Sequence, residues 1–238
     1  MLAQSFEAFG RVDTSQSMSP WLRSNGILAV NGGVALPLGV MTFDDVTEVR
    51  SGFAQTGFSF TFLEADHFLH KHFGWGVRWT RHQFGFDHEG FADWFRIRAP
   101  WLDFYARSED PWVTHFAMGQ VVGIIPTEIV DVDLRIGLGY VYTRRPSILI
   151  EGYENATGFF SFSWQQEQAI TNSVGWNFGS NFRFHIDRDI DLMFYWEYGG
   201  SRPNFQVLNI YARSNEEIEE WDQPIQFISM GGGLAIRL

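Results

Sequence analysis

The segment that decides the fold is residues 173–186, which read SVGWNFGSNFRFHI. Its even-numbered positions are mostly aromatic or aliphatic, and its odd-numbered positions are small or polar. The two sets are Val174, Trp176, Phe178, Ser180, Phe182, Phe184 and Ile186 against Ser173, Gly175, Asn177, Gly179, Asn181, Arg183 and His185. Successive side chains of a β-strand point to opposite faces. The segment is therefore predicted to be a strand with one apolar and one polar face.

The next segment, Ile190 to Tyr198, repeats this alternation after a link of three residues, Asp187-Arg188-Asp189. A link this short predicts an antiparallel hairpin. If Ile186 pairs with Ile190, then His185 lies opposite Asp191 and the polar residues of both strands share one face. The alternation and the hairpin register therefore agree.

Six further segments alternate in the same way: Ile27–Leu38, Gly57–Glu64, Phe73–Phe86, Trp112–Ile124, Val130–Tyr142 and Gln226–Leu238. In most of them an apolar face is predicted to point outward and a polar or glycine-rich face inward. In the fourth segment the residues predicted to point outward are Trp112, Phe116, Met118, Val122 and Ile124. The chain thus contains eight predicted strands, each long enough to cross a bilayer at a tilt.

The links between these strands alternate in length. Those around 65–72, 125–129 and 187–189 are short, whereas 39–56, 87–111, 143–172 and 200–225 are long. Outer-membrane barrels have short periplasmic turns and long extracellular loops. We predict an all-β fold, an eight-stranded antiparallel up-and-down transmembrane β-barrel in the bacterial outer membrane. It spans residues 26–238 after a periplasmic segment 1–25, and both termini are periplasmic.

Two other folds compete with this one. A soluble up-and-down barrel reverses the polarity, and side chains such as Trp176 and Phe178 would overfill an eight-stranded interior. The uncharged stretch 24–43 has the length of a membrane-spanning helix. It contains Asn31, Gly32, Gly33 and Pro37, and its apolar residues favour alternate positions, so a strand is preferred.

The composition limits the possible functions. With 28 acidic and 17 basic residues the net charge is -11, which argues against nucleic-acid binding. The absence of cysteine excludes disulfides and thiolate metal sites. The opening Met1-Leu2-Ala3-Gln4 has the look of the end of a secretory signal peptide, or else of an ordinary frayed terminus. We expect no cofactor; the expected partners are outer-membrane lipid and lipopolysaccharide, with other outer-membrane proteins as further candidates.

Four segments are informative beyond their alternation: residues 57–87, Asp110-Pro111-Trp112, Gly137-Leu138-Gly139-Tyr140 and the ending Gly231-Gly232-Gly233-Leu234-Ala235-Ile236-Arg237-Leu238. Together they resemble the small outer-membrane β-barrel proteins of Bacteroidota-type bacteria, which are OmpX/OmpA-barrel-like. The resemblance covers most of residues 26–238 and implies export, periplasmic chaperoning and insertion by the barrel-assembly machinery. Many such proteins end in an aromatic residue, whereas this chain ends in Leu238. The resemblance concerns the fold and assigns no reaction.

The inward faces carry charges of both signs. The residues predicted to form a polar network in the lumen are Arg78, Asp131, Asp133, Arg135, Asn181, Arg183, His185, Asp191, Glu197 and Arg237. The interior of so narrow a barrel is filled by side chains, and an unpaired buried charge is very costly. We therefore predict a hydrogen-bonded plug and not a conducting pore.

Two functions of different classes remain. The first is a structural, accessory or partner-binding subunit that acts through its aromatic loops, with candidate contacts at Trp94, Phe95, Trp101, Phe104 and Tyr105. The alternative is a lipid-A acyltransferase or deacylase. It would use His82 and His115, both predicted to face inward, with Ser108, Glu109 and Asp110 nearby in sequence. Such a site requires a nucleophile, a base and an acid within hydrogen-bonding reach.

No metal site is predicted. His67, His70 and His72 cluster in a predicted turn, and residues 215–222 form an acidic run without the donor spacing of a calcium loop. Both are interpreted as solvated segments. Residues 148–164 are predicted to form a hairpin that extends above the membrane, and Pro100 is predicted to interrupt any helix in residues 91–105.

Overall fold

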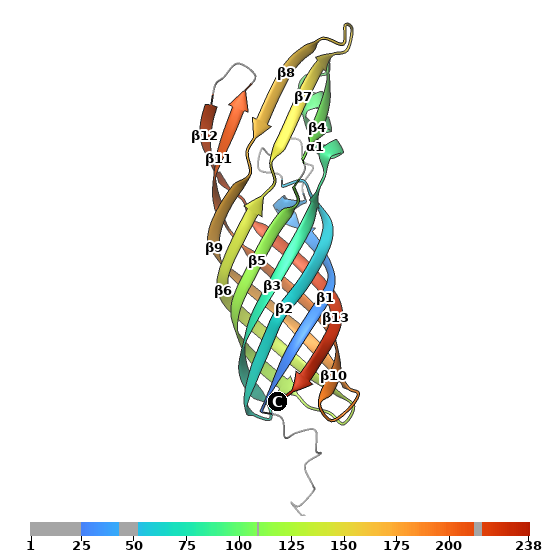
Figure 1. The fold of residues 1–238 in the computed structure, drawn as a ribbon, viewed down its shortest axis with the longest axis vertical. Helices are drawn as coiled ribbons and strands as arrows, with labels where there is room; N and C mark the ends of the chain where they lie inside the picture. The colour runs from blue at the N-terminus through green and yellow to red at the C-terminus, as the bar shows by residue number, and fades with distance from the viewer. Residues whose placement is uncertain (1–24, 43–51, 109, 212–215) are drawn as a thin grey trace, which may run out of the picture.

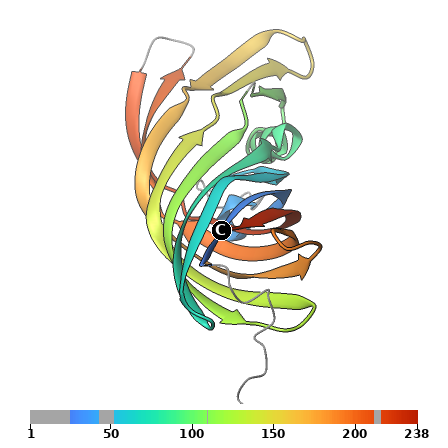
Figure 2. The ribbon, with the colours of Figure 1, turned by 60° about the horizontal axis from the view of Figure 1, so that its bottom comes forward.

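The computed structural model describes residues 25–42, 52–108, 110–211 and 216–238, and in it eight antiparallel strands close into a barrel (Figure 1). The predicted fold is confirmed. The barrel strands are β1 (Gly26–Leu38), β2 (Ala54–His70), β3 (Phe73–Phe86), β5 (Trp112–Ile125), β6 (Val130–Arg145), β9 (Ala169–His185), β10 (Ile190–Ser201) and β13 (Ile225–Arg237). Each pairs with its neighbour in this order, and β13 pairs with β1 to close the ring. Turned so that the lower end comes forward, the strands form a continuous wall (Figure 2).

The two ends of the barrel differ. At one end, here called the turn end, the links are residues 71–72, 126–129 and 186–189. At the other, the extension end, the links contain η2 (Gly39–Met41), α1 (His88–Arg98), β4 (Leu102–Arg107), β7 (Ile148–Glu154), β8 (Phe160–Gln166), β11 (Asn204–Tyr211) and β12 (Glu216–Asp222). These last five strands form a separate sheet in the order β12-β11-β8-β7-β4, here called the extension sheet (Figure 1). The predicted alternation of short and long links is confirmed.

The helix α1 begins and ends where its sequence requires. The side chain of Asp87 accepts a hydrogen bond from the backbone N–H of Gly90 at 3.1 Å, which caps the first turn. The helix stops at Arg98, because a residue before proline disfavours the helical conformation and Ala99 precedes Pro100. Phe91 and Ala92 turn into the apolar cluster under the extension sheet.

The predicted hairpin register is also confirmed. The backbone N–H of Ile186 donates to the carbonyl of Ile190 at 3.1 Å, and His185 lies opposite Asp191. Asn181 lies opposite Tyr195, and both side chains are buried inside the barrel. The polar faces of β9 and β10 therefore point into the lumen together.

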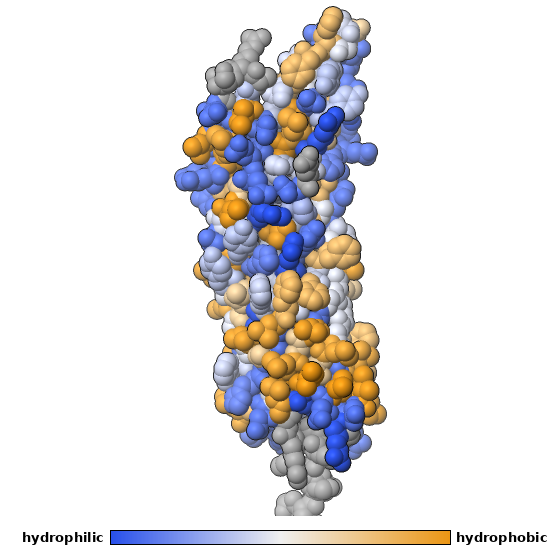
Figure 3. Space-filling model, in the orientation of Figure 1, coloured by the Kyte–Doolittle hydropathy of each residue, from blue (hydrophilic) through white to orange (hydrophobic). Residues whose placement is uncertain are grey.

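The outer wall near the turn end is apolar. A broad band of hydrophobic residues runs across the lower half of the visible face, and hydrophilic residues lie above it (Figure 3). Outward-facing members include Phe58, Phe60, Phe73, Trp75, Val77, Trp79, Leu134, Ile136, Leu138, Phe178, Phe194, Trp196, Met230 and Leu234. Water does not accommodate an exposed apolar surface of this extent, whereas the hydrocarbon core of a membrane does.

One predicted strand orientation is wrong. Phe116 is 1% exposed and Met118 is 3% exposed, so these side chains of β5 point inward. The register places Phe116 opposite Thr80 and Met118 opposite Arg78, both of which line the lumen. The prediction failed because both faces of β5 are apolar: Ala117, Gly119 and Val121 face outward and Phe116, Met118 and Val122 inward. Trp112 and Ile124 are likewise buried.

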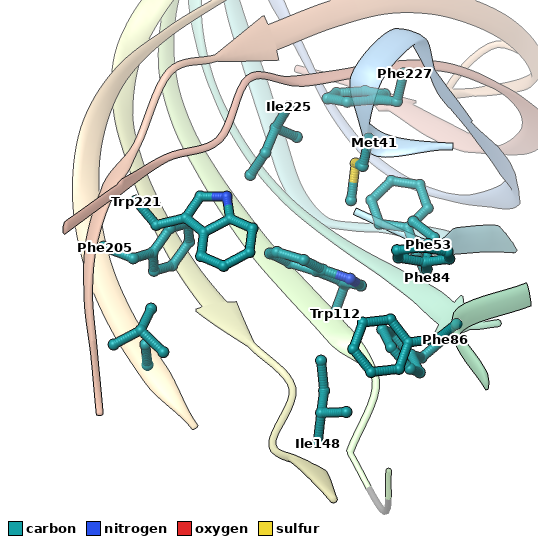
Figure 4. Packing of buried hydrophobic residues seen from close by; sticks show 14 of the residues in the cluster. Met41, Phe53, Phe84, Phe86, Trp112, Ile148, Phe205, Trp221, Ile225 and Phe227 are labelled. Carbon is teal, nitrogen blue, oxygen red and sulfur yellow. The ribbon is translucent and has the colours of Figure 1, made fainter. Parts of the chain in front are cut away.

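The main apolar core lies at the extension end of the lumen and continues under the extension sheet. In Figure 4 it is formed by Met41, Phe53, Phe84, Phe86, Trp112, Ile148, Phe205, Trp221, Ile225 and Phe227. Its members come from barrel strands and from extension strands, so one core joins the two parts.

The remaining expectations concern the extension and the terminus. The predicted hairpin in residues 148–164 is present as β7 and β8. The acidic run, expected to be a solvated loop, is instead the strand β12, in which Trp221 lies opposite Phe205 of β11. The proposed periplasmic segment 1–25 falls almost wholly outside the described residues. Among the helices of the described ranges, none has the length and hydrophobicity to span a membrane.

Candidate functional site: the filled lumen and the extension sheet

The lower part of the lumen, toward the turn end, contains a connected group of charges. Arg183 of β9 donates to Asp133 of β6 from Nε at 2.7 Å, and its other nitrogens lie 3.2 Å from Asp131 and 3.3 Å from Asp191. Asp191 of β10 also accepts from Arg237 of β13, whose Nε is 3.0 Å away. The Nδ1 atom of His185 lies 2.9 Å from Asp191.

A second layer lies above this group. Arg135 of β6 contacts Glu64 at 2.9 Å, Asp66 at 2.6 Å and Asp133 at 3.3 Å. Arg78 of β3 pairs with Glu197 of β10, and its Nε lies 3.5 Å from Glu64. The amides of Asn31 and Asn181 donate to the two oxygens of Glu64, at 3.1 and 2.8 Å.

The structure thus brings all ten predicted lumen residues into one network and adds Asn31, Glu64 and Asp66. The acidic pair was missed because the predicted strand ended at Glu64, whereas β2 continues to His70. A bulge between Thr61 and Leu63 shifts the alternation by one residue. Glu64, Asp66 and Phe68 then alternate with a period of two. This alternation was the feature of the sequence that could have predicted the inward orientation of Glu64 and Asp66.

Above the network, aromatic side chains fill the lumen. His82 is fully buried, with its ring centroid 4.0 Å from that of Phe227 and 5.4 Å from that of Phe116. Phe84 lies beside them, 6.3 Å from Phe227. The interior is therefore closed twice, first by charges and then by aromatic rings.

The two histidines of the enzyme hypothesis do not meet. His115 lies opposite Arg81 on the outer face of the barrel, whereas His82 lies opposite Thr114 inside it. The prediction that both face inward is wrong, and it failed together with the orientation of β5. Ser108 donates to the backbone carbonyl of Asp110, and the Asp110 carboxylate accepts from Gln168 at 3.1 Å. Neither side chain is hydrogen-bonded to His82. Glu109 lies outside the described residues.

The aromatic residues of the predicted partner-binding loop divide into two groups. Phe104, a predicted partner contact, is 2% exposed and packs between Phe95 and Phe162, at centroid distances of 5.5 and 6.1 Å. Trp94 is half-buried beneath the guanidinium of Arg98. These side chains hold α1 against the extension sheet and are not free to contact a partner.

Trp101 and Tyr105 point away from this core. Trp101 is 65% exposed and Tyr105 is 50% exposed. The Tyr105 ring lies 5.9 Å from that of Tyr153, which lies 5.8 Å from that of Phe160. The Trp101 carbonyl accepts a hydrogen bond from the backbone N–H of Asn155, two residues beyond Tyr153. We call Trp101, Tyr105, Tyr153 and Phe160 the aromatic patch.

Acidic groups border the aromatic patch. The Tyr105 hydroxyl donates to Asp103 at 2.9 Å, and this hydrogen bond, together with the carboxylate charge, raises the pKa of Tyr105. Glu154 and Asn155 line a shallow groove with Asp103, Tyr105 and Tyr153. The outer face of β4 and β7 thus combines exposed rings with carboxylate and amide acceptors.

Metal ligands do not assemble in the part of the chain that the structure describes. The rings of His70 and His72 are 5.9 Å apart, and the Nδ1 atom of His72 lies 3.1 Å from the carbonyl of Ile124. His67 packs against Trp75 on the outer wall. The acidic side chains of β12 are spread along an extended strand.

Comparison with protein-family models finds no match, and comparison with curated proteins finds none either. Solved structures do match. A major outer membrane protein from Thermus thermophilus is 13% identical, with 90% of this chain and 99% of that chain covered and a TM-score of 0.51. Neisserial surface protein A is 12% identical over 90% and 98% of the two chains, with a TM-score of 0.45. At such identity a shared fold carries no shared activity. The chain has the fold of the outer-membrane β-barrel proteins.

Proposed function

We propose that this protein is an integral barrel of the bacterial outer membrane that binds a partner on the outer leaflet side through its aromatic patch. In this arrangement the turn end and both termini are periplasmic and the extension sheet is extracellular. The single observation that carries the proposal is the exposed aromatic patch on a sheet held rigid by its own core. The finer resemblance to Bacteroidota-type barrels stays a prediction.

The exterior supports a membrane location. Most outward residues of the barrel strands are apolar near the turn end, and in a closed barrel all backbone groups of the wall are paired. The short turns and the elaborate opposite end match the two sides of outer-membrane barrels.

The interior argues against transport through the lumen. Six carboxylates and four arginines occupy the lower lumen, and His82, Phe84, Phe116 and Phe227 occupy the upper lumen. Barrels of eight strands have interiors that side chains can fill, whereas porins use many more strands. A role on the outside of the barrel is therefore favoured.

The patch has the features of a binding surface. Exposed aromatic rings are enriched at the centres of protein interfaces, because they bury much area with little loss of conformational entropy. The neighbouring Asp103 and Glu154 supply acceptors; Asp103 is paired with Arg96 at 3.4 Å, and Glu154 adds negative charge. We infer a partner that presents apolar groups together with cationic or hydrogen-bond-donating groups.

Native purification from membranes in mild detergent tests this function. We expect a partner to co-purify with the wild type and to be lost from a Trp101→Ser/Tyr153→Ser variant. The matched control is Ile218→Ser/Tyr211→Ser, which removes exposed apolar side chains from β12 and β11, at the other side of the extension sheet. A partner that survives the patch substitutions, or is lost equally from the control, contradicts the proposal.

The geometry does not favour the lipid-A-modifying alternative, because His82 and His115 lie on opposite faces of the wall. We expect lipid-A mass spectra of cells with and without the protein to be the same. A shifted acyl composition would restore that alternative.

A further inference from the structure

A small group of basic residues lies on the outer wall of the barrel. In the row of paired residues across β3, β5 and β6, Arg81 lies opposite His115, which lies opposite Tyr142. Arg144 is two residues beyond Tyr142, on the same outward face. We call Arg81, His115 and Arg144 the basic cluster.

Within the described part of the chain, the two arginines of the basic cluster lack acidic partners. Arg78, Arg135, Arg183 and Arg237 are neutralised in the lumen, whereas neither Arg81 nor Arg144 forms an ion pair with a carboxylate among the described residues. The Arg81 guanidinium donates to the amide oxygen of Gln83, at 3.0 Å. The Nε atoms of both arginines are shielded from solvent and have no hydrogen-bond partner among the described residues. In a chain with 28 acidic and 17 basic residues, this is an unexpected excess of positive charge.

The position of the cluster is as informative as its charge. Trp79 lies two residues from Arg81 toward the turn end, and Tyr140 lies two residues from Tyr142 in the same direction; both are exposed on the outer wall. Trp79 and Tyr140, one row closer to the turn end, thus belong to the apolar band. The extension sheet begins beyond Arg144. On the face that contains β2, β3, β5 and β6, hydrophilic residues lie directly above the apolar band (Figures 1 and 3).

We propose that the basic cluster binds the phosphate of a lipid headgroup in the outer leaflet. This inference rests on the proposed membrane location but not on the aromatic patch. A headgroup phosphate lies at the edge of the hydrocarbon core, at the height where the wall changes from apolar to basic. The occupant is a phosphorylated lipid and not a second protein, because the apolar band directly below provides a surface for its acyl chains.

The chemistry of the cluster suits a phosphate. Guanidinium groups bind phosphate oxygens with two parallel N–H donors, and charge-assisted hydrogen bonds are stronger than neutral ones. Arg81 and Arg144 approach from opposite sides of His115, whose ring supplies one more N–H donor when neutral. The rings of Trp79 and Tyr142 lie 6.2 and 5.8 Å from His115 and flank the same spot.

Native mass spectrometry of the full chain in detergent micelles tests the proposal, with diphosphorylated lipid A as the probe. We expect retention of this lipid by the wild type, and an affinity lower by about tenfold or more in an Arg81→Gln/Arg144→Gln variant. Lipid A stripped of both phosphates should bind both proteins equally weakly. An Arg81→Lys/Arg144→Lys variant, which keeps the charge but loses the paired donors, should fall between the two.

The control is Arg107→Gln/Arg188→Gln, which removes the same charge from the extension sheet and from a turn-end link. It should bind like the wild type, and heat-modifiable gel migration should show that all variants fold. Equal binding by the wild type and the Arg81→Gln/Arg144→Gln variant overturns the proposal. So does equal binding of phosphorylated and dephosphorylated lipid, or a change of oligomeric state without a change in lipid binding. Loss of a partner from the Trp101→Ser/Tyr153→Ser variant is measured by co-purification and not by lipid binding. The proposed partner binding and the proposed lipid site can therefore fail independently.

Discussion

Arg78 and Glu197 form an ion pair across the full width of the lumen. Arg78 lies on β3 and Glu197 on β10, and β10 is the fourth strand from β3 in either direction around the ring. Both side chains are buried. Asn181 of β9 reaches Glu64 of β2 in the same way, at 2.8 Å. The network therefore braces opposite walls of the barrel and does more than fill space.

The first prediction concerns this brace. Replacing Arg78 with Met leaves Glu197 buried without its cationic partner, which should lower the free energy of unfolding by about 3–5 kcal/mol. Arg78→Met/Glu197→Met removes both charges and should recover most of the loss. Equilibrium unfolding in urea with detergent measures both variants. If the double variant is as unstable as the single one, the paired charges are not the cause.

The second prediction concerns conductance. Because charges fill the lower lumen and aromatic rings the upper lumen, the wild type should show no conductance steps in planar bilayers. Phe84→Ala/Phe227→Ala removes two rings of the upper closure and leaves the charged network intact. This variant should also stay closed. Stepwise currents from it would show that the network does not seal the lumen alone.

The third prediction concerns the position of the barrel wall in the bilayer. Leu138 is exposed on β6, eight residues from the turn-end boundary Val130, whereas Ile170 is exposed one residue from the extension end of β9. An arginine near the bilayer midplane costs about 2–4 kcal/mol, and one near the interface about 0–1 kcal/mol. Leu138→Arg should therefore destabilise the barrel far more than Ile170→Arg in lipid vesicles. Equal losses would place the apolar band outside the hydrocarbon core.

The fourth prediction concerns pH. The hydrogen bond to Asp103 raises the pKa of Tyr105 above its ordinary value near 10. The folded-state pKa is raised, so the stabilisation is present below pH 10 and is lost as the pH rises through the raised value. Asp103→Asn should lower the Tyr105 pKa. Subtracting the tyrosinate absorbance of the matching Tyr105→Phe variant isolates the titration of Tyr105 in each protein. If the titration midpoint of Tyr105 is the same with and without Asp103, the hydrogen bond does not raise its pKa.

The sequence predicted the parts of the fold in which the two faces of a strand differ. Residues 173–186 predicted their strand, its orientation and the register to β10, because aromatic and polar positions alternate without interruption. The strand β5 defeated the same reasoning, since inward Met118 and Val122 are as apolar as outward Val121. Its orientation is set by pairing with Arg78 and Thr80 of β3, which is tertiary information.

The candidate sites were predictable to different degrees. The lumen network was predicted except for Asn31 and for Glu64 and Asp66, which the bulge in β2 shifts inward. The β7–β8 hairpin of the extension sheet was predicted, whereas β12 was not, because its acidic composition is typical of loops and it is held as a strand by its hairpin pairing with β11. Phe104 and Trp101 are both aromatic and only three residues apart, so the sequence could not assign one to a buried and the other to an exposed environment.

The pairing of β1 with β13 has a consequence for how the barrel assembles. Ile27 lies opposite Arg237, and an added Cβ at Gly231 would collide with the carbonyl oxygen of Gly32, so the strands meet at glycine. Every other wall contact joins strands nearer in sequence than these two. A chain that has formed all its hairpins still has two unpaired edges, which lipid cannot satisfy. We therefore expect ring closure and entry into the bilayer to proceed together, with the pairing of β1 and β13 as the slow step of folding.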